Sequence, residues 1–182
     1  MKKALVSDIA IIRPLSPDDA LDELTELLHR AYAPLAAAGM RFLASHQNVA
    51  TTLFRATSGS CFVCETENKL VGTITIYSSQ ADSPCEYYRQ GGVFHFGQFA
   101  VDPDIQAQGL GDMLLRHAEE FATKMGAHTI AFDTPENADR LISWYVKRGY
   151  KPVGKVDWDA TNYASIVFGK DLSVNGPSLY VE

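Results

Sequence analysis

The chain has 182 residues, of which 46% are hydrophobic and 21% are charged, a composition typical of one soluble globular domain. The net charge of −6 argues against nucleic acid or an anionic membrane as the main partner, and no apolar run reaches the roughly 18 residues that span a bilayer. Three cysteines suggest no disulfide framework, and the N-terminus lacks the apolar stretch of a signal peptide. We therefore expect a cytoplasmic protein that binds neither nucleic acid nor membrane.

The first half of the chain predicts two helices and three strands. Ser16 resembles a helix cap, Pro17 suits a first helical position, and an apolar stripe continues to Tyr32. The segment from Pro34 to Gly39 reads as a break, and a hairpin turns at residues 67–69. The predicted elements are a strand at 9–13, a helix at 16–32, a helix at 41–55, and strands at 60–65 and 70–77.

The second half alternates strands and helices around a glycine-rich turn. Apolar residues recur at helical spacing after this turn until Gly126 ends the pattern. The predicted elements are a polar loop at 78–92, a strand at 93–101, a turn at 106–111, a helix at 110–125, a strand at 129–134, a helix at 137–148, and strands at 150–156 and 163–168. We expect a single domain at residues 9–172, followed by a polar tail at 173–182.

The turn from Gln106 to Gly111 joins the end of a strand to the start of a helix. The unpaired N–H groups of a first helical turn and the positive end of the helix dipole attract anions. Gly109 and Gly111 have no Cβ, so a phosphate can approach the backbone closely. The sequence therefore predicts a diphosphate site.

The order of these elements resembles that of the GNAT superfamily of N-acetyltransferases. The superfamily's Gln/Arg-x-x-Gly-x-Gly/Ala motif is matched by Gln106, Gly109 and Gly111, and the segment from Trp144 to Tyr150 resembles its Tyr-x-x-x-Gly-Phe/Tyr segment. The resemblance covers roughly residues 9–172. It implies an α/β (α+β) fold, with a mixed, mostly antiparallel twisted sheet of about seven strands flanked by helices.

The resemblance also implies acetyl-CoA as cosubstrate, with no metal, and direct attack by a primary amine. In that superfamily the pantetheine arm pairs with the strand that here contains Phe99, Ala100 and Val101. A backbone N–H of Phe99 or Ala100 would stabilise the oxyanion. The residues expected at the diphosphate are Gln106, Ala107, Gln108, Gly109, Leu110, Gly111 and Asp112. Asp112 departs from the small or basic residues common there, and it also suits the helix dipole.

Tyr145 matches the tyrosine that protonates the leaving thiolate in that superfamily, and a phenol with a pKa of about 10 stays protonated at neutral pH. The alternative is that Tyr145 only packs beside Trp144. Asn137 lies where relatives place a CoA-contacting asparagine, but one residue beyond the common spacing, and it fits an N-cap equally well.

The general base is less determined by the sequence. The strand at 93–99 offers His95, whose ordinary pKa of about 6.5 suits a base, and a packed histidine is equally consistent. Gln98 cannot act as a base, and it is predicted to contact substrate together with Tyr88 and Tyr163. Glu86, Tyr88 or water alone are further options for proton transfer.

The acceptor is expected to be a small-molecule or peptide amine. The loop at 78–92 is expected to cover its side of the site, since such loops often carry specificity. A non-catalytic acyl-CoA-binding module and a nucleotide-binding regulator remain alternatives, and a homodimer is possible because dimers are frequent in the superfamily.

Cys61 and Cys64 are three residues apart on a predicted strand, so their side chains face opposite sides of it and do not suggest a metal site. His117 lies in a helical apolar stripe and is expected to pack.

Overall fold

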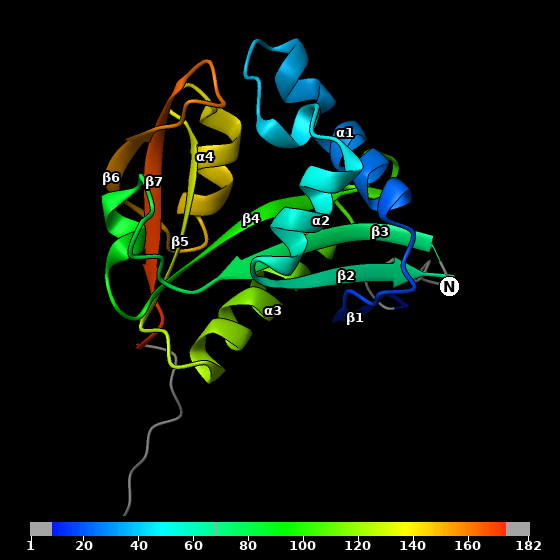
Figure 1. Ribbon diagram of the computed structural model, residues 1–182, viewed down its shortest axis with the longest axis horizontal. Coiled ribbons are helices and arrows are strands. Elements are labelled where there is room, and N and C mark those ends of the chain that lie inside the picture. Colours follow the sequence, from blue (N-terminus) through cyan, green and yellow to red (C-terminus); the bar gives the residue numbers. More distant parts are fainter. Residues whose placement is uncertain (1–8, 68, 174–182) are drawn as a thin grey trace, which may run out of the picture.

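The computed structural model describes residues 9–67 and 69–173 (Figure 1). Residues 1–8, residue 68 of the predicted hairpin turn, and the predicted tail beyond 173 lie outside the described part. The elements, in chain order, are β1 (Ile11–Pro14), α1 (Leu21–Ala37), η2 (Leu43–Ser45), α2 (Val49–Thr57), β2 (Ser60–Thr66), β3 (Lys69–Tyr77), η3 (Glu86–Arg89), β4 (Val93–Val101), η4 (Pro103–Ile105), α3 (Leu110–Lys124), β5 (Thr129–Pro135), α4 (Asp139–Val146), β6 (Lys151–Asp157) and β7 (Ala164–Asp171).

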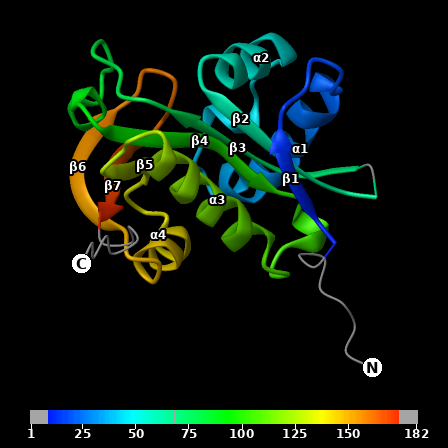
Figure 2. The same ribbon diagram turned by 90° about the horizontal axis from the view of Figure 1, so that it is seen from below.

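Seven strands form one sheet in the order β1-β2-β3-β4-β5-β7-β6. Every neighbouring pair is antiparallel except β4 and β5, which run parallel. Helices α1 and α2 cover one face, and α3 and α4 cover the other (Figure 2). The main apolar core lies between the sheet and the α3–α4 layer, where Leu114, Ala118 and Ile130 have no exposed surface. The predicted mixed, mostly antiparallel sheet flanked by helices is confirmed.

Strands β4 and β5 are paired along only part of their length. The register joins Val93–His95 to Thr129–Ala131 and then ends, while β4 continues beside β3 and β5 continues beside β7. We call the unpaired parts, residues 96–101 of β4 and 132–135 of β5, the β4–β5 fork. The two strands separate here because each follows a different neighbour.

A bulge in β4 lies within the fork. Thr75 is opposite Gly97 and Thr73 is opposite Ala100, so Ile74 alone faces both Gln98 and Phe99. Gln98 adopts φ 47°, in the left-handed region that non-glycine residues rarely occupy. A bulge of this kind turns the backbone groups of its strand away from the regular ladder.

The predicted bounds of the first helix were wrong at both ends. The helix begins at Leu21 rather than after Ser16, since Asp19 closes a tight turn by accepting the Ser16 N–H at 2.6 Å and pairing with Arg13 at 2.7 Å. It also continues through Pro34 to Ala37. Proline removes one helical hydrogen bond, but Pro34 lies on the exposed side of α1, where water can satisfy the freed carbonyl.

Three other local predictions also differ from the structure. The predicted helix at 41–55 divides into η2 and α2, because Asn48 starts a new helix by accepting the Thr51 N–H at 2.8 Å. Helix α4 is shorter than predicted and begins after Ala138 without a side-chain cap, so the N-cap role of Asn137 was wrong. The predicted polar loop at 78–92 contains η3 and buries Cys85 and Tyr88.

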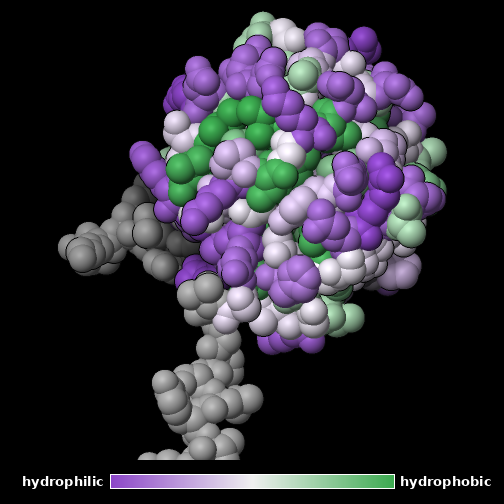
Figure 3. Space-filling view, turned by 90° about the vertical axis from the view of Figure 1, so that its left-hand side faces the viewer, coloured by the Kyte–Doolittle hydropathy of each residue, from purple (hydrophilic) through white to green (hydrophobic). Residues whose placement is uncertain are grey.

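Strand β6 forms one edge of the sheet, and its residues 151–155 are exposed. Lys151, Pro152 and Lys155 lie along it, and a register shift follows Pro152. Charges, proline and bulges disfavour pairing with another strand. Figure 3, viewed from this side, shows hydrophilic residues interspersed with smaller hydrophobic groups. A homodimer stays a prediction. None of the described helices combines the length and apolar character needed to cross a membrane.

Candidate active site

The turn predicted to hold a diphosphate lies between η4 and α3. Ala107 has φ 62° and Gly109 has φ 88°, and Gly109 is the N-cap residue of α3. The Gln106 amide donates to the Val101 carbonyl at 3.3 Å, which fixes the turn to the end of β4. The left-handed conformations of these two residues turn the chain directly into α3, whose first N–H groups therefore adjoin the turn. Most of the turn is exposed and accessible to a ligand.

Gly111 faces Trp144 of α4 and Val101 of β4. A Cβ at this position would lie 3.6 Å from Trp144 Cζ2 and 4.0 Å from Val101 Cγ2. The space above Gly111 is therefore bounded by α4 on one side and by the end of β4 on the other. The turn therefore lies beside the end of β4, the strand that carries the bulge. The position of Trp144 next to Gly111 was not predicted from the sequence.

The unusual Asp112 is accounted for by an ion pair. Its Oδ1 accepts from Arg148 Nε at 2.5 Å, and the Arg148 guanidinium also lies 3.6 Å above the Trp144 ring. The carboxylate is therefore balanced by a cation from the end of α4. Its position in the first turn of α3 also favours the helix dipole. A negative residue in the turn is thus compatible with anion binding beside it.

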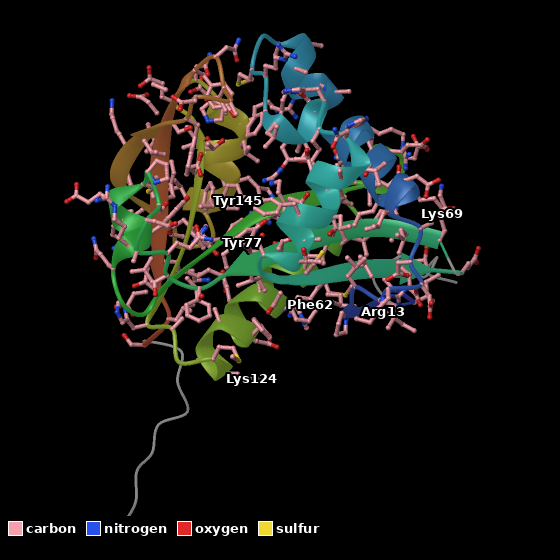
Figure 4. All side chains as sticks on the ribbon, in the orientation of Figure 1. Arg13, Phe62, Lys69, Tyr77, Lys124 and Tyr145 are labelled. Carbon is pink, nitrogen blue, oxygen red and sulfur yellow. The ribbon has the colours of Figure 1, made fainter. Side chains whose placement is uncertain are left out.

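Tyr145 is buried between α4 and the sheet (Figure 4). Its ring centroid lies 3.8 Å from that of Phe132, and Phe132 stacks on Phe96 at 5.3 Å, so the α3–α4 face of the fork is aromatic. Burial raises the pKa of Tyr145 well above 10, and nearby Tyr32 raises it further. In the described part of the chain the hydroxyl forms no hydrogen bond, and Tyr145 keeps 5% of its surface exposed. It therefore keeps its proton, which is what a general acid requires.

Tyr32 reaches the bulge from the opposite face of the sheet. Its hydroxyl donates to the Phe99 carbonyl at 3.0 Å, and its ring packs on Phe42 with centroids 5.1 Å apart. Tyr32 raises the pKa of Tyr145 although α1 and α4 lie on opposite faces of the sheet. The bulge is thus approached by a tyrosine from each helical layer.

His95 does not have the pKa expected from the sequence. It stacks on Tyr88 with ring centroids 4.0 Å apart and on Tyr77 at 5.1 Å. Burial lowers its pKa from 6.5 to about 4, and Nδ1 is buried without a hydrogen-bond partner in the described structure. Desolvation between two tyrosines makes the ring a weak proton acceptor at neutral pH, and a catalytic role for His95 stays a prediction.

Gln98 belongs to a buried polar network. Its carbonyl accepts from the Gln47 amide at 2.8 Å, and its own amide donates to Thr75 at 3.2 Å. Only 2% of Gln98 is exposed. These bonds hold the bulged residue against α2, and a role in substrate binding stays a prediction.

Tyr88 and Trp158 converge on Asp133 in β5. The Tyr88 hydroxyl donates to Asp133 Oδ1 at 3.0 Å, and Trp158 Nε1 donates to Oδ2 at 2.8 Å. Burial raises the pKa of Asp133, although both hydrogen bonds oppose this shift. The sequence analysis missed Asp133, even though an acidic residue within the apolar run 130–134 is an available signal. Glu86, in η3, is exposed.

Tyr163 extends an aromatic wall from β7 toward α1. Its ring centroid lies 5.3 Å from that of Phe42, which in turn packs on Tyr32. Asn162 joins the same two regions, since it donates to the Gly39 carbonyl at 3.0 Å and accepts from the Arg41 N–H at 3.0 Å. Tyr163 is therefore near Tyr32, on the α1–α2 face, whereas Tyr145 is on the other face. Asn137 is exposed in the turn before α4, and its contact with CoA stays a prediction.

The cysteines and His117, which the sequence analysis also considered, are packed inside the protein. Cys61, Cys64 and Cys85 are free and buried. His117 packs edge-on against Phe62, with ring centroids 4.4 Å apart. In residues 9–67 and 69–173, no three His, Cys, Asp or Glu side chains come together as ligands for a metal ion.

Comparison with known proteins shows that this fold belongs to a class of acetyltransferases. The model of the Acetyltransferase (GNAT) family matches residues 21–150. S-(2-succino)cysteine N-acetyltransferase of Bacillus subtilis (strain 168) is 32% identical over 138 residues, covering 75% of this chain and 81% of that protein. This chain therefore belongs to the GNAT family.

Solved structures agree with this assignment at the level of the fold. The ribosomal-protein-S18-alanine N-acetyltransferase from Escherichia coli has a TM-score of 0.68 at 20% identity, over 94% of this chain and 99% of that one. A GNAT family acetyltransferase from Elizabethkingia anophelis with acetyl-CoA bound has a TM-score of 0.64 at 15% identity, over 90% and 99%.

The chain is thus an N-acetyltransferase that uses acetyl-CoA and acts on an amine. Its family membership and its curated relative disfavour the two alternatives, a non-catalytic acyl-CoA-binding module and a nucleotide-binding regulator.

Proposed function

We propose that acetyl-CoA lies along the path from the Gln106–Asp112 turn to the β4 bulge. The first N–H groups of α3 hold the diphosphate, and Phe99, Ala100 and Val101 present backbone groups to the pantetheine arm. The Phe99 or Ala100 N–H stabilises the oxyanion at the bulge. Support comes from the φ values of Ala107 and Gly109 and from the lack of a side chain at Gly111, which lies next to Trp144 and the end of β4.

Tyr145 is the proposed general acid in this reaction. Its protonated hydroxyl lies in an aromatic environment beside the fork, where the C–S bond of the thioester would break. A departing thiolate takes the phenolic proton, and water restores it afterwards. The absence of another hydrogen-bond partner in the described chain leaves this proton available. His95 is proposed to position Tyr88 instead of acting as a base, because its pKa of about 4 makes it a poor proton acceptor at neutral pH.

The acceptor is proposed to be the amino group of a small amino acid with a substituted thiol, of the kind represented by S-(2-succino)cysteine. The observation that carries this proposal is the 32% identity over most of both chains to the enzyme named for that substrate. Tyr88 and Tyr163 border the acceptor side, in keeping with a specificity role for the loop at 78–92. A cytoplasmic location is part of the same proposal, since all three cysteines are free.

An acceptor panel tests this function. Purified protein is incubated with acetyl-CoA and one amine at a time, and released CoA thiol is measured with a chromogenic disulfide. The panel contains S-(2-succino)cysteine, S-methylcysteine, spermidine and an alanine-initiated peptide. We expect the highest kcat/KM for a cysteine derivative. A preference of about tenfold or more for spermidine or the peptide would refute the proposed acceptor class, because tenfold corresponds to about 1.4 kcal/mol of discrimination.

A further inference from the structure

Arg55, near the end of α2, is a partly buried arginine without an ionic partner. Arg13, Arg30 and Arg148 each form an ion pair within the described residues, whereas Arg55 does not. Among residues 9–67 and 69–173, its side chain forms one hydrogen bond, from Nη1 to Gln47 Oε1 at 2.6 Å. A guanidinium has five N–H donors, so most of its capacity is unused. Partial burial of such a cation points to an anionic ligand.

The Arg55 guanidinium lies over Gly97 of β4. A Cβ at Gly97 would be 3.3 Å from Arg55 Nη2, so the lack of a side chain there makes room for the guanidinium. The Tyr77 hydroxyl donates to the Arg55 carbonyl at 3.1 Å and fixes the end of α2 to the sheet. Arg55 is therefore held next to Gly97, the residue that precedes Gln98 of the β4 bulge.

Asp133 occupies the corresponding position on β5. The parallel register pairs His95 with Ala131, and two residues further along each strand it would pair Gly97 with Asp133 if the pairing continued. Residues two apart on a strand share a face, and Tyr88 contacts both His95 and Asp133 on that face. A cation and a carboxylate thus lie on opposite sides of the fork, on the α1–α2 face.

Neither charge neutralises the other by direct contact. The separation of Arg55 and Asp133 exceeds the 4.0 Å of an ion pair, since none is formed between them. Asp133 accepts one hydrogen bond on each oxygen, and each oxygen keeps capacity for another. Arg55 nevertheless lowers the pKa of Asp133, so the two groups share one electrostatic environment.

We propose that Arg55 and Asp133 form a subsite for a zwitterionic acceptor, in which Arg55 binds the α-carboxylate and Asp133 binds the α-ammonium group. This inference rests on the proposed function and adds the residues that select an amino acid over a simple amine. A guanidinium matches a carboxylate through paired hydrogen bonds. The aromatic wall of Tyr32, Phe42 and Tyr163 is then available to the side chain of the acceptor.

The subsite also provides a route for the protons of the acceptor. Asp133 takes one proton from the ammonium group and later releases it to water. The neutral nitrogen then forms the N–C bond to the acetyl carbon, and the C–S bond breaks as the thiolate receives the Tyr145 proton. The second nitrogen proton leaves through water and restores Tyr145. One ammonium ion and one thioester become one amide, one thiol and one released proton.

Titratable groups on several elements face Asp133 and will shape its pH dependence. They lie on α1, α2, β4, the segment around η3 and the start of β7, and comprise Tyr32, Arg55, His95, Cys85, Tyr88 and Tyr163. Burial raises the pKa values of the tyrosines and the thiol, and it lowers the pKa of His95 to about 4. Because burial raises the pKa of Asp133, protonation of its carboxylate is expected to produce the acidic limb of the pH–rate profile.

The test compares three acceptors that differ only at the α-carboxylate. They are S-(2-succino)cysteine, its α-methyl ester, and S-(2-succino)cysteamine, which lacks that carboxylate. Each is assayed with the wild type, Arg55→Met, Asp133→Asn and the control Arg116→Met, which changes an exposed arginine on α3. Far-UV circular dichroism and acetyl-CoA affinity verify that each variant is folded.

We expect Arg55→Met to raise the KM for S-(2-succino)cysteine by about tenfold or more, with less than about threefold change for the other two acceptors. Asp133→Asn should lower kcat for all three by about 10²-fold and abolish the acidic limb of the pH–rate profile. Arg116→Met should resemble the wild type.

Two other results have separate meanings. If wild type acetylates the three acceptors but Arg55→Met alters all three equally or none, the subsite is refuted and the proposed function stands. If wild type releases CoA with none of these acceptors yet acetylates another panel amine, the proposed acceptor is refuted. In that case, the pH–rate profile is measured with the amine that is acetylated. If the Asp133→Asn variant has the same acidic limb as the wild type, the subsite is refuted independently.

Discussion

The replacement Tyr145→Phe tests the general acid by removing a single oxygen from a buried ring. The ring contacts with Phe132, Trp144 and Tyr150 remain, because phenylalanine keeps the same aromatic shape. In the described chain the hydroxyl has no hydrogen-bond partner, so its removal breaks no intramolecular bond. The replacement should therefore change the free energy of unfolding by less than about 1 kcal/mol.

The expected kinetic effect is much larger than the effect on folding. General acid catalysis contributes about 10²–10⁴-fold, or roughly 3–5 kcal/mol at 1.36 kcal/mol per factor of ten. We therefore expect kcat to fall by that factor while the KM for acetyl-CoA changes less than about threefold. Because the pKa of Tyr145 lies well above 10, the loss should be the same from pH 6 to 9.

Tyr150→Phe is the matched control, since Tyr150 belongs to the same aromatic cluster. Its hydroxyl donates to Glu119 at 3.0 Å, so its removal should lower the free energy of unfolding by about 1–2 kcal/mol and leave kcat within about twofold. Steady-state CoA release and urea unfolding measure both quantities for both variants. A Tyr145→Phe enzyme with wild-type kcat, or one that is altered only in the KM for acetyl-CoA, would refute the general-acid role.

Two further predictions concern the α1–α2 face. His95 has a folded pKa of about 4 against 6.5 when unfolded, so the unfolded chain binds more protons between these values, and stability should fall by about 3 kcal/mol as pH drops from 6.5 to 4. Urea unfolding of His95→Phe should lack this component, while exposed His46→Gln retains it; equal slopes in all three proteins would contradict it. Tyr88→Phe removes a hydrogen bond that lowers the pKa of Asp133, so the acidic limb of the pH–rate profile should move to higher pH, and an unmoved or lowered limb would disprove the link.

Local sequence signals were sufficient for the parts of the site built from contiguous residues. The strand Val93–Val101 has the predicted bounds, because an apolar run ending at Asp102-Pro103 leaves little alternative. The glycine-rich turn also follows that strand as predicted and leads into α3 at Leu110. Helix ends were harder to predict. The start of α1 depends on the contact between Arg13 and Asp19, and its continuation to Ala37 depends on the exposure of Pro34 to water.

The acceptor side depends on contacts between residues far apart in the sequence. Asp133 acquires its surroundings from Tyr88 and Trp158, which come from separate loops. The low pKa of His95 likewise arises only when Tyr77 and Tyr88 enclose the ring. Arg55 is one of several arginines in the sequence, and its lack of an ionic partner becomes evident only in the folded chain. Periodicity and motif spacing contain no information about such tertiary contacts.

The position of the cofactor is tested most directly by calorimetric titration of acetyl-CoA into the wild type, Gly111→Ala and Gly111→Val. A Cβ at Gly111 is in ordinary contact with Trp144 at 3.6 Å, so alanine is accommodated, whereas the two methyl groups of valine would occupy the space between Trp144 and Val101. We predict that Gly111→Val weakens acetyl-CoA binding by about tenfold or more, at least 1.4 kcal/mol, and that Gly111→Ala weakens it less. Wild-type affinity in a folded Gly111→Val protein would contradict the placement of the cofactor at this turn.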